Sequence, residues 1–215
     1  MLDTYRHQGL RKKLVAIIRS KGIRDEEVLD AIGKVPRHFF MDSSFLEHAY
    51  EDKAFPIGSG QTISQPYTVA FQTQLLEVKR GEKILEVGTG SGYQSCILLE
   101  MGARVYTVER QKKLFEKTRK FFENYPLRPR IFLKDGYQGL PTFAPFDKII
   151  ITASVGEIPE QLISQLRTGG FIVAPVGEND IQFMTRITKL PENQIKKETF
   201  GTFVFVPMLK EISND

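Results

Sequence analysis

The sequence predicts a doubly wound α/β fold with a mostly parallel sheet, preceded by a helical N-terminal segment and completed by antiparallel strands at one edge. From Lys83 onward, short apolar strands alternate with amphipathic helices. The strands IIIT (149–152) and FIVAPV (171–176) are continuous apolar runs, which is typical of strands buried on both faces of a parallel sheet. The alternation stops after residue 176, which predicts the different edge.

The predicted N-terminal segment consists of helices over about the first 50 residues. A first helix ends at Gly22 and has apolar residues at helical spacing, namely Leu10, Leu14, Ile17 and Ile18. Asp25 can cap a second helix, which ends at Val35-Pro36 and carries Val28, Leu29 and Ile32. We expect this segment to pack on the core as part of the same domain.

The predicted core begins at Lys83. Strands are expected over 83–87, 104–108, 130–133, 148–152 and 171–176, and helices over 93–100, 114–122 and 158–166. Only residues 177–180 separate the last of these strands from the alternating stretch 181–188, which is too short for a crossover helix. Strands 181–188 and about 197–207 are therefore expected to add antiparallel to one edge. We divide the chain into an N-terminal helical segment with its loop (1–80) and a core (81–215), which together form one domain.

Composition and charge narrow the class of protein. The 215 residues are 41% apolar, enough for one sizeable core, and the lack of a long apolar run predicts a cytoplasmic protein without a membrane span. A single cysteine, Cys96, and three scattered histidines predict no disulfide and no metal site. The net charge of +4 favours a solvated surface over a nucleic-acid patch, since the densest basic group, Arg11-Lys12-Lys13, lies on a predicted helix. Without a heptad pattern, a monomer is expected.

A glycine-rich turn, Glu86-Val87-Gly88-Thr89-Gly90-Ser91-Gly92, joins the strand 83–87 to the helix 93–100. Glycines let the backbone approach a ligand and a helix N-terminus offers free N–H groups, so such a turn suits a nucleotide. The dinucleotide fingerprint would have its third glycine at position 93, which is Tyr93 here. The turn residues expected to hold the cofactor are Gly88, Thr89, Gly90, Ser91 and Gly92.

Acidic residues after three successive strands indicate which nucleotide binds. Glu86 would repel a pyrophosphate, whereas S-adenosylmethionine offers an α-ammonium and a sulfonium. Glu109 can accept both ribose hydroxyls, and Asp135-Gly136 can accept the adenine amino group. Each has an alternative: Glu86 could cap a helix, Glu109 could pair with Arg110, and Asp135-Gly136 could be an ordinary turn. Together they favour S-adenosylmethionine, with a nicotinamide enzyme as the alternative.

Two observations indicate the methyl acceptor: the motifs of nucleic-acid methyltransferases are missing, and several segments are similar to those of another family. The loop 152–156, TASVG, lacks the Asp/Asn-Pro-Pro-aromatic sequence of nucleic-acid amino methyltransferases, and Cys96 lies in a helix rather than in a nucleophile loop. The segment AFPIGSGQTISQPY (54–67) is too polar for a core strand and too rich in anchoring residues for a linker. With VPRHFF (35–40), ILEVGTGSGYQ (84–94) and QLISQLRTGGFIVAPVG (161–177), the chain resembles the protein-L-isoaspartate O-methyltransferase family.

The resemblance implies a Rossmann-like methyltransferase fold, S-adenosyl-L-methionine as cofactor, and the free α-carboxylate of L-isoaspartyl residues in damaged peptides and proteins as substrate. Ser64 matches the family's active-site serine. A loop that closes over the cofactor corresponds to Gln61, Thr62, Ile63 and Ser64, and the ribose and adenine contacts correspond to Glu109, Asp135 and Gly136. Two positions depart from the family pattern, with Ser154 in place of alanine and Lys210 in place of glycine.

The chemistry explains why no catalytic triad is present. An α-carboxyl has a pKa of about 3.5, so it is ionised at neutral pH and needs no general base. Ser64 can donate a hydrogen bond to the acceptor carboxylate or to the cofactor carboxylate, or it could fasten the loop backbone. Two further alternatives stay open, a methyltransferase acting on RNA or a small molecule, and a sensor that holds the cofactor without turnover. The stretch Phe200 to Phe205 is expected to form an edge strand and could pair with an extended peptide.

Overall fold

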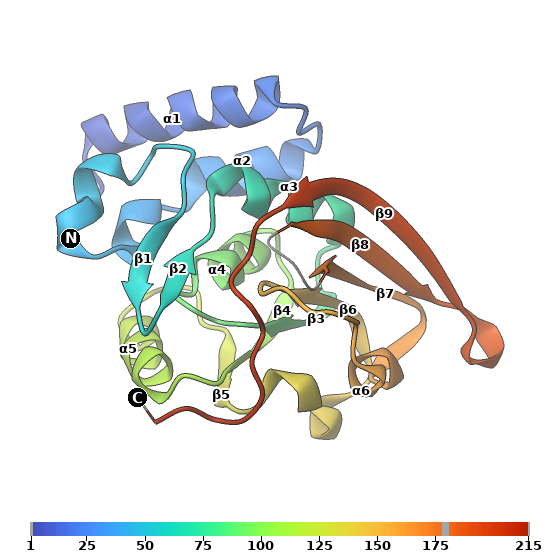
Figure 1. Ribbon diagram of the computed structural model, residues 1–215. Coiled ribbons are helices and arrows are strands. Elements are labelled where there is room, and N and C mark those ends of the chain that lie inside the picture. Colours follow the sequence, from blue (N-terminus) through green and yellow to red (C-terminus); the bar gives the residue numbers. More distant parts are fainter. Residues whose placement is uncertain (1, 178–180, 215) are drawn as a thin grey trace.

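A seven-stranded sheet forms the centre of the computed structural model, which describes residues 2–177 and 181–214 (Figure 1). Its strand order is β5-β4-β3-β6-β7-β8-β9. The strands are β3 (Lys83–Val87), β4 (Arg104–Glu109), β5 (Arg130–Leu133), β6 (Phe146–Ile151), β7 (Leu166–Val176), β8 (Gln182–Lys189) and β9 (Ile195–Phe203). The first five are parallel to their neighbours, whereas β8 and β9 add antiparallel. The predicted parallel sheet with an antiparallel edge is therefore confirmed; residues 178–180 of the predicted turn lie outside the described residues.

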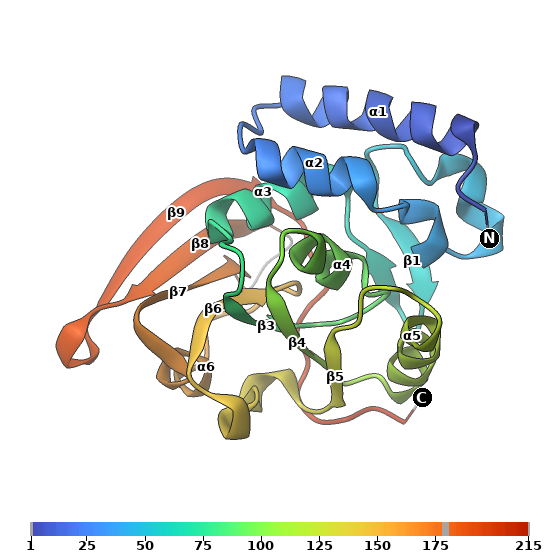
Figure 2. The same ribbon diagram turned by 180° about the vertical axis from the view of Figure 1, so that it is seen from behind.

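Helices cover both faces of this sheet, as Figure 2 shows from behind. They are α1 (Tyr5–Ser20), α2 (Glu26–Lys34), α3 (Pro66–Leu76), α4 (Tyr93–Glu100), α5 (Lys112–Glu123) and α6 (Glu160–Ser164). Alternate residues of β3 separate the two cores: Ile84 packs with residues of α3 and α4, while Leu85 and Val87 pack with Leu162 of α6. This alternation is what a doubly wound sheet requires of its central strands.

The N-terminal segment packs against α3, α4 and α5 through one continuous apolar cluster. Leu14 of α1, Ile32 of α2 and Cys96 of α4 belong to this cluster and are almost fully buried. The Thr4 side chain accepts a hydrogen bond at the start of α1, and Asp25 caps α2 as the sequence predicts. Helix α3 was not predicted, because its apolar residues follow no clear helical stripe.

Several predicted boundaries differ from those observed. Strand β7 begins at Leu166 rather than at 171, and α6 is only five residues long, because Gln165 O accepts the Phe146 N–H and Leu166 already pairs with Phe146 of β6. Strand β9 ends at Phe203 rather than at about 207. The segment 54–67, predicted as a loop, contains a short antiparallel hairpin formed by β1 (Phe55–Gly58) and β2 (Gln61–Ile63).

Candidate active site

A cavity of about 980 Å³ opens at the carboxyl ends of β3, β4 and β6. Strand β3 lies between β4 and β6, so the strand order reverses here, and open α/β sheets bind ligands at such a switch point. The β1–β2 hairpin with the start of α3 lines one side of the cavity, the turns after β3, β4 and β6 line the other, and residues 202–209 complete the lining. We call the two sides the turn wall, formed by residues 87–91, 108–111 and 152–153, and the hairpin wall, formed by residues 61–69.

The glycine-rich turn has a conformation and a packing that require glycine. Gly88 has a φ of 100°, and a Cβ on it would lie 2.5 Å from Thr152 Oγ1. Thr152 donates from this hydroxyl to the carbonyl oxygens of Val87 and Gly88, at 3.0 and 2.7 Å. A Cβ on Gly92 would meet the Phe122 ring at 2.5 Å. Gly88, Thr89, Gly90 and Ser91 line the cavity, as predicted for cofactor-binding residues, whereas Gly92 is not among the lining residues.

Glu109 lies at the end of β4 and lines the cavity. Its Oε2 accepts the Gly90 N–H and its Oε1 accepts the Gln111 N–H, both at 2.8 Å. Burial raises the pKa of this carboxyl, and the two backbone donors oppose that shift. Each carboxylate oxygen keeps a further lone pair, so both can still accept a hydroxyl from a ligand.

Glu86 occupies a different position from the one the turn sequence suggests. Its side chain is fully buried beneath the turn, where Oε2 accepts the Ser95 hydroxyl, and it does not line the cavity. No described residue hydrogen-bonds to its Oε1. Burial raises the pKa of Glu86 to about 8. A contact between Glu86 and a cationic part of a cofactor stays a prediction.

Asp135 stabilises a turn, which is the alternative role that the sequence analysis left open for it. Its Oδ1 accepts the Tyr137 N–H at 2.9 Å, and its Oδ2 accepts the Glu211 N–H of the C-terminal segment at 3.0 Å. Asp135 is not among the residues that line the cavity, but Gly136 is, and a Cβ on Gly136 would lie 2.6 Å from Val87 Cγ1. The adenine contact of Asp135 therefore stays a prediction, while Gly136 provides close backbone approach.

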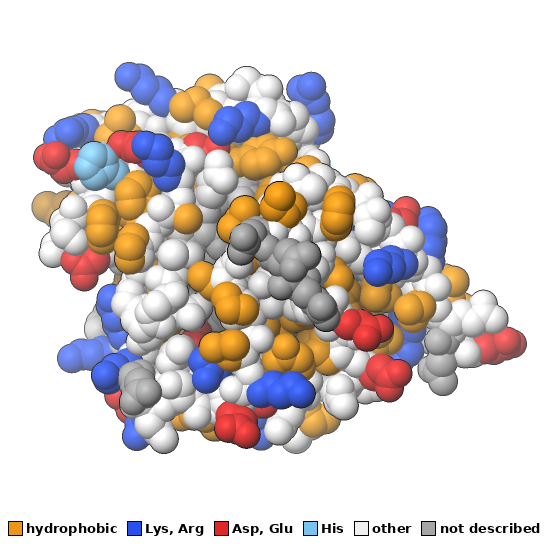
Figure 3. Space-filling view, in the orientation of Figure 1, with side chains coloured by type: hydrophobic (Ala, Val, Ile, Leu, Met, Phe, Trp, Pro, Cys, Tyr) orange, Lys and Arg blue, Asp and Glu red, His pale blue; other side chains and the backbone are white. Residues whose placement is uncertain are grey.

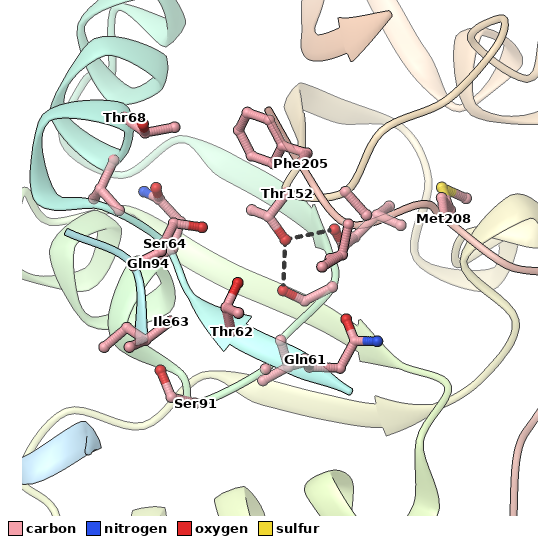
Figure 4. A pocket seen from close by; sticks show the side chains of 18 of the residues that line it. Gln61, Thr62, Ile63, Ser64, Thr68, Ser91, Gln94, Thr152, Phe205 and Met208 are labelled. Atoms are coloured by element: carbon pink, nitrogen blue, oxygen red, sulfur yellow. Dashed lines mark hydrogen bonds between the residues drawn. The ribbon is translucent and has the colours of Figure 1, made fainter. Parts of the chain in front are cut away.

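The hairpin wall carries polar groups that have no internal partner. Gln61, Thr62, Ile63 and Ser64 all line the cavity, as Figure 4 shows. Within the described chain, the Ser64 hydroxyl makes no hydrogen bond of its own. The wall is anchored just behind Ser64, because Asp52 accepts the Tyr67 N–H at 2.8 Å and the Gln65 Nε2–H at 3.0 Å. Ser64 is thus held by its backbone while its hydroxyl stays available.

The C-terminal segment after β9 forms part of the cavity, whereas the sequence indicated only that Phe200 to Phe205 could pair with an extended peptide, which stays a prediction. Residues 202–209 line the cavity, Phe205 and Met208 among them (Figure 4). Two backbone bonds fix the segment across the strand ends: Ser154 N–H donates to Val206 O, and Met208 N–H donates to Ser154 O, each at 2.8 Å. Serine in place of alanine at 154 leaves both bonds intact because they use the backbone. Sequence offered no signal for this crossing, since it depends on contacts some 50 residues apart.

Gln94 also belongs to the site, although the sequence did not predict it as a site residue. It is the last residue of the segment ILEVGTGSGYQ (84–94). Its side chain lines the cavity close to Ser64 in the view of Figure 4. Gln94 Nε2 donates to Thr73 Oγ1 at 2.9 Å, and Thr73 in turn donates to Val69 O. This chain of donors fixes which way the amide points and leaves Gln94 Oε1 without a partner among the described residues.

Asp3, His7 and His38 bring ligand-type atoms within 4.8 Å of one another outside the cavity, a cluster that sequence spacing did not predict. The rings of His7 and His38 are stacked, with centroids 3.9 Å apart and planes at 25°. A metal ion binds in the plane of an imidazole at about 2.0–2.1 Å, and stacked rings do not share such a point. Arg11 also pairs with Asp3 at 2.8 Å. The cluster fastens the N-terminus and does not support a metal site.

The fold and the cavity place the protein among the Rossmann-like methyltransferases, with a nucleotide-type site at the carboxyl edge of the sheet. The model of the protein-L-isoaspartate(D-aspartate) O-methyltransferase family matches residues 9–213, and the chain belongs to that family. Within the described residues, no helix is long and apolar enough to cross a membrane.

Relatives of known name agree with this assignment. The chain is 56% identical over 212 residues to the protein-L-isoaspartate O-methyltransferase of Christiangramia forsetii, covering 98% of this chain and 99% of the relative. It is 58% identical to that of Flavobacterium johnsoniae with the same coverage. Among solved structures, a Plasmodium falciparum protein described as a protein-L-isoaspartate O-methyltransferase in complex with S-adenosyl-L-homocysteine superposes with a TM-score of 0.79 at 27% identity, covering 94% of this chain and 99% of that one.

Proposed function

We propose that the protein transfers the methyl group of S-adenosylmethionine to the free α-carboxylate of L-isoaspartyl residues, as a repair enzyme for damaged peptides and proteins. The observation that carries this proposal is the pairing of a nucleotide-type turn wall with a hairpin wall whose Ser64 hydroxyl is unpartnered. Family membership and the names of relatives that are more than half identical over nearly the whole chain support the same activity.

The residues present fit the cofactor. Gly88 and Gly136 line the cavity with backbone alone, because a Cβ on either would collide with Thr152 or Val87, and such a bare backbone suits close approach of a nucleoside. Glu109 offers a lone pair on each carboxylate oxygen beside the cavity, which suits the two hydroxyls of a ribose. When bound, S-adenosylmethionine supplies an electrophilic methyl group on a sulfonium. We propose that the cofactor contacts the residues that line the cavity, which are Gln61, Thr62, Ile63, Ser64, Gly88, Thr89, Gly90, Ser91, Glu109 and Gly136. Glu86, Gly92 and Asp135 lie outside the lining, and we propose that they serve cofactor binding by supporting the turns that carry it.

The chain's own residues position the acceptor and exclude water. The substrate carboxylate is already ionised, so no side chain has to remove a proton before attack. Ser64 donates a hydrogen bond that fixes the carboxylate and its line of approach, which is the main contribution open to the protein in a displacement of this kind. The hairpin wall and Phe205 of the C-terminal segment enclose the reacting groups, and a drier site strengthens the attraction between carboxylate and sulfonium.

The direct test compares two peptides that differ only in one linkage. The protein is incubated with methyl-labelled S-adenosylmethionine and either an L-isoaspartyl peptide or its normal aspartyl counterpart. We expect base-labile label on the isoaspartyl peptide alone, because only that linkage leaves an α-carboxylate free. Equal labelling of both peptides, or labelling of RNA instead, would support the broader methyltransferase alternative, and binding without any transfer would support the sensor.

Three further properties rest on the sequence and belong to the same proposal. We propose a monomer, a cytoplasmic location, and one cooperative domain made of segment 1–80 and core 81–215. The shared apolar cluster that joins Leu14, Ile32 and Cys96 supports the single domain. A single unfolding transition, followed by both tyrosine fluorescence and far-ultraviolet circular dichroism, is the expected result, and two separated transitions would argue for independent units.

A further inference from the structure

The positive charge of the chain is concentrated at one edge of the molecule. Residues 110–134 contain nine basic and two acidic side chains, a net charge of +7, whereas the whole chain carries +4, so all other residues together carry −3. We call the nine cations the basic edge: Arg110, Lys112, Lys113, Lys117, Arg119, Lys120, Arg128, Arg130 and Lys134. This concentration is less apparent in the sequence than the uninterrupted group Arg11-Lys12-Lys13, because apolar residues interrupt it along the chain.

The basic edge is exposed and forms no salt bridge with the described residues, although Lys117 lies near Asp42 and Arg110 near Glu109. Eight of the nine side chains are exposed, and Arg110 is half-buried. None of the nine forms an ion pair within the described part of the chain, although Glu116 and Glu123 lie on the same helix. Figure 3 shows Lys and Arg side chains gathered over α5, beside the C-terminal segment. Unpaired cations of one sign produce a surface potential that attracts anionic partners.

The basic edge also adjoins the cavity. Arg110 and Gln111 line the cavity at the base of α5. Thr118 in the middle of α5 donates to Gly90 O at 2.6 Å, so the inner face of this helix holds the glycine-rich turn. The opposite face of the same helix presents Lys113, Lys117 and Lys120 to solvent. A partner attracted to these cations therefore arrives next to the site of methyl transfer.

The surroundings of the cations favour a protein over other polyanions. Single-stranded RNA is held by exposed aromatic platforms, but every aromatic side chain between 110 and 134 is buried or partly buried. Membrane surfaces are held by a row of apolar side chains beside the cations. No large exposed apolar residue occurs in 110–134, and the adjoining stretch 209–214 adds just two among the described residues, Leu209 and Ile212. Proteins that carry isoaspartyl residues from asparagine have gained one carboxylate for each such event, so damage makes them more acidic.

We propose that the basic edge steers acidic, isoaspartyl-bearing proteins toward the cavity and lowers the KM for them. This inference rests on the proposed function. Steering of this kind acts on encounter and weak binding, so it changes KM and its salt dependence, while the turnover number of a bound substrate is unaffected.

The test uses two isoaspartyl peptides with the same central residues, one flanked by glutamates and one by glutamines. In low salt, the unmodified protein is expected to show a KM about three to ten times lower for the glutamate-flanked peptide, and this preference is expected to disappear in about 0.5 M salt. The combined variant Lys113→Gln, Lys117→Gln and Lys120→Gln is expected to lose most of the preference and to keep kcat for the glutamine-flanked peptide.

A matched control removes three charges elsewhere. Arg6→Gln, Lys12→Gln and Lys13→Gln change exposed residues of α1 that form no ion pair with the described residues, and this variant is expected to keep the preference. Equal KM values for both peptides, or a preference that survives the α5 substitutions, would overturn the proposal. So would tight RNA binding that only the α5 variant loses, without any peptide preference. Failure to methylate the glutamine-flanked peptide would instead count against the proposed function itself.

Discussion

The two walls of the cavity differ in how far their polar groups are already hydrogen-bonded. On the turn wall, Gly90 N–H is bonded to Glu109, and Thr152 is bonded to Gly88 O. On the hairpin wall, the side chains of Gln61, Thr62 and Ser64 have no partner among the described residues. The sheet therefore fixes the cofactor side before any ligand arrives, whereas the hairpin keeps its donors free for the reacting groups.

The turn wall is also held more firmly to the rest of the fold than the hairpin wall. The turn wall is built on β3, β4 and β6, and the parallel pairing of β3 with both neighbours is regular up to the turn. The hairpin wall rests on a two-stranded sheet with an irregular register and on a few side-chain bonds to Asp52. Two-stranded ribbons are marginal by themselves, so the hairpin depends on packing at its base. We expect changes to the turn wall to affect cofactor binding and changes to the hairpin wall to affect turnover.

The largest effect is expected from Gly88→Ala on the turn wall. A left-handed conformation costs a residue with a Cβ about 1–2 kcal/mol, and overlap with Thr152 adds about 1–3 kcal/mol. The total strain of about 4 kcal/mol corresponds to a nearly thousandfold loss of cofactor affinity if all of it is relieved by moving the turn. Moving the turn relieves the strain and should appear as weaker binding of S-adenosylhomocysteine by calorimetry. Gly9→Ala is the control, since nothing lies near its Cβ position. Unchanged affinity together with unchanged urea stability in Gly88→Ala would contradict the account of the turn.

The next effect is expected from Ser64→Ala on the hairpin wall. Loss of the hydroxyl removes the positioning hydrogen bond, and we expect kcat to fall about 100-fold while the Kd for S-adenosylhomocysteine changes less than about threefold. Ser59→Ala, at the exposed tip of the same hairpin, should leave both values unchanged. Unchanged turnover in Ser64→Ala would remove the catalytic role of this serine, and a matching loss of cofactor affinity would place its bond on the cofactor.

The turn wall could be predicted from sequence because its determinants are local. The apolar run 83–87, the glycines at 88, 90 and 92, and an acid at the end of the next strand all lie within one strand-helix-strand unit. Continuous apolar strands also identified the parallel sheet, because burial on both faces leaves no alternation. The hairpin was located by the polar run 58–65, but its strands were not expected, since three-residue strands have no periodicity to detect.

What sequence could not predict depends on contacts between distant residues. The crossing of residues 202–209 over the cavity is fixed by bonds to Ser154, and the role of Asp135 is set by Glu211 from the far end of the chain. The burial of Glu86 was equally hidden, because a strand position two residues before a glycine does not reveal which face of the sheet it enters. Each of these features depends on a contact with a distant residue or on the face of the sheet that a strand residue enters, and no local sequence pattern contains either.

A moderate effect on the turn wall is expected from Glu109→Gln. One side of the new amide must turn its NH₂ toward the N–H of Gly90 or Gln111, and one charged acceptor for the ribose is lost. Bonds to charged groups contribute about 1.5–3 kcal/mol, so the Kd for S-adenosylhomocysteine should rise about 10- to 100-fold. At saturating cofactor, kcat should stay within about threefold. Glu116→Gln on the exposed face of α5 is the control. A loss of kcat without a loss of affinity would contradict the role of Glu109 in cofactor binding.

The smallest effect is expected beneath the turn wall, from Glu86→Gln. Burial raises the pKa of Glu86 in the folded protein to about 8, above its unfolded value of about 4.3. A group shifted in this direction contributes stability that is fully present below the unfolded pKa and is lost as the pH rises through the folded pKa. The protein without cofactor should therefore be less stable toward urea at pH 8 than at pH 6, and Glu86→Gln should reduce this difference.

Glu123→Gln, which changes an exposed carboxyl of α5, should leave the pH dependence as it is. Parallel pH profiles for the unmodified protein and Glu86→Gln would show that the buried carboxyl is not protonated in the folded state. A measurement of cofactor binding distinguishes a structural role of Glu86 from direct contact with the ligand. A carboxyl that ionises to face a cationic ligand releases a proton on binding below pH 8, so calorimetry of S-adenosylmethionine in two buffers of different ionisation enthalpy should detect proton release in the unmodified protein and none in the glutamine variant. A purely structural Glu86 would release no proton in either, and the turn wall would then hold the ligand through its backbone and Glu109 alone.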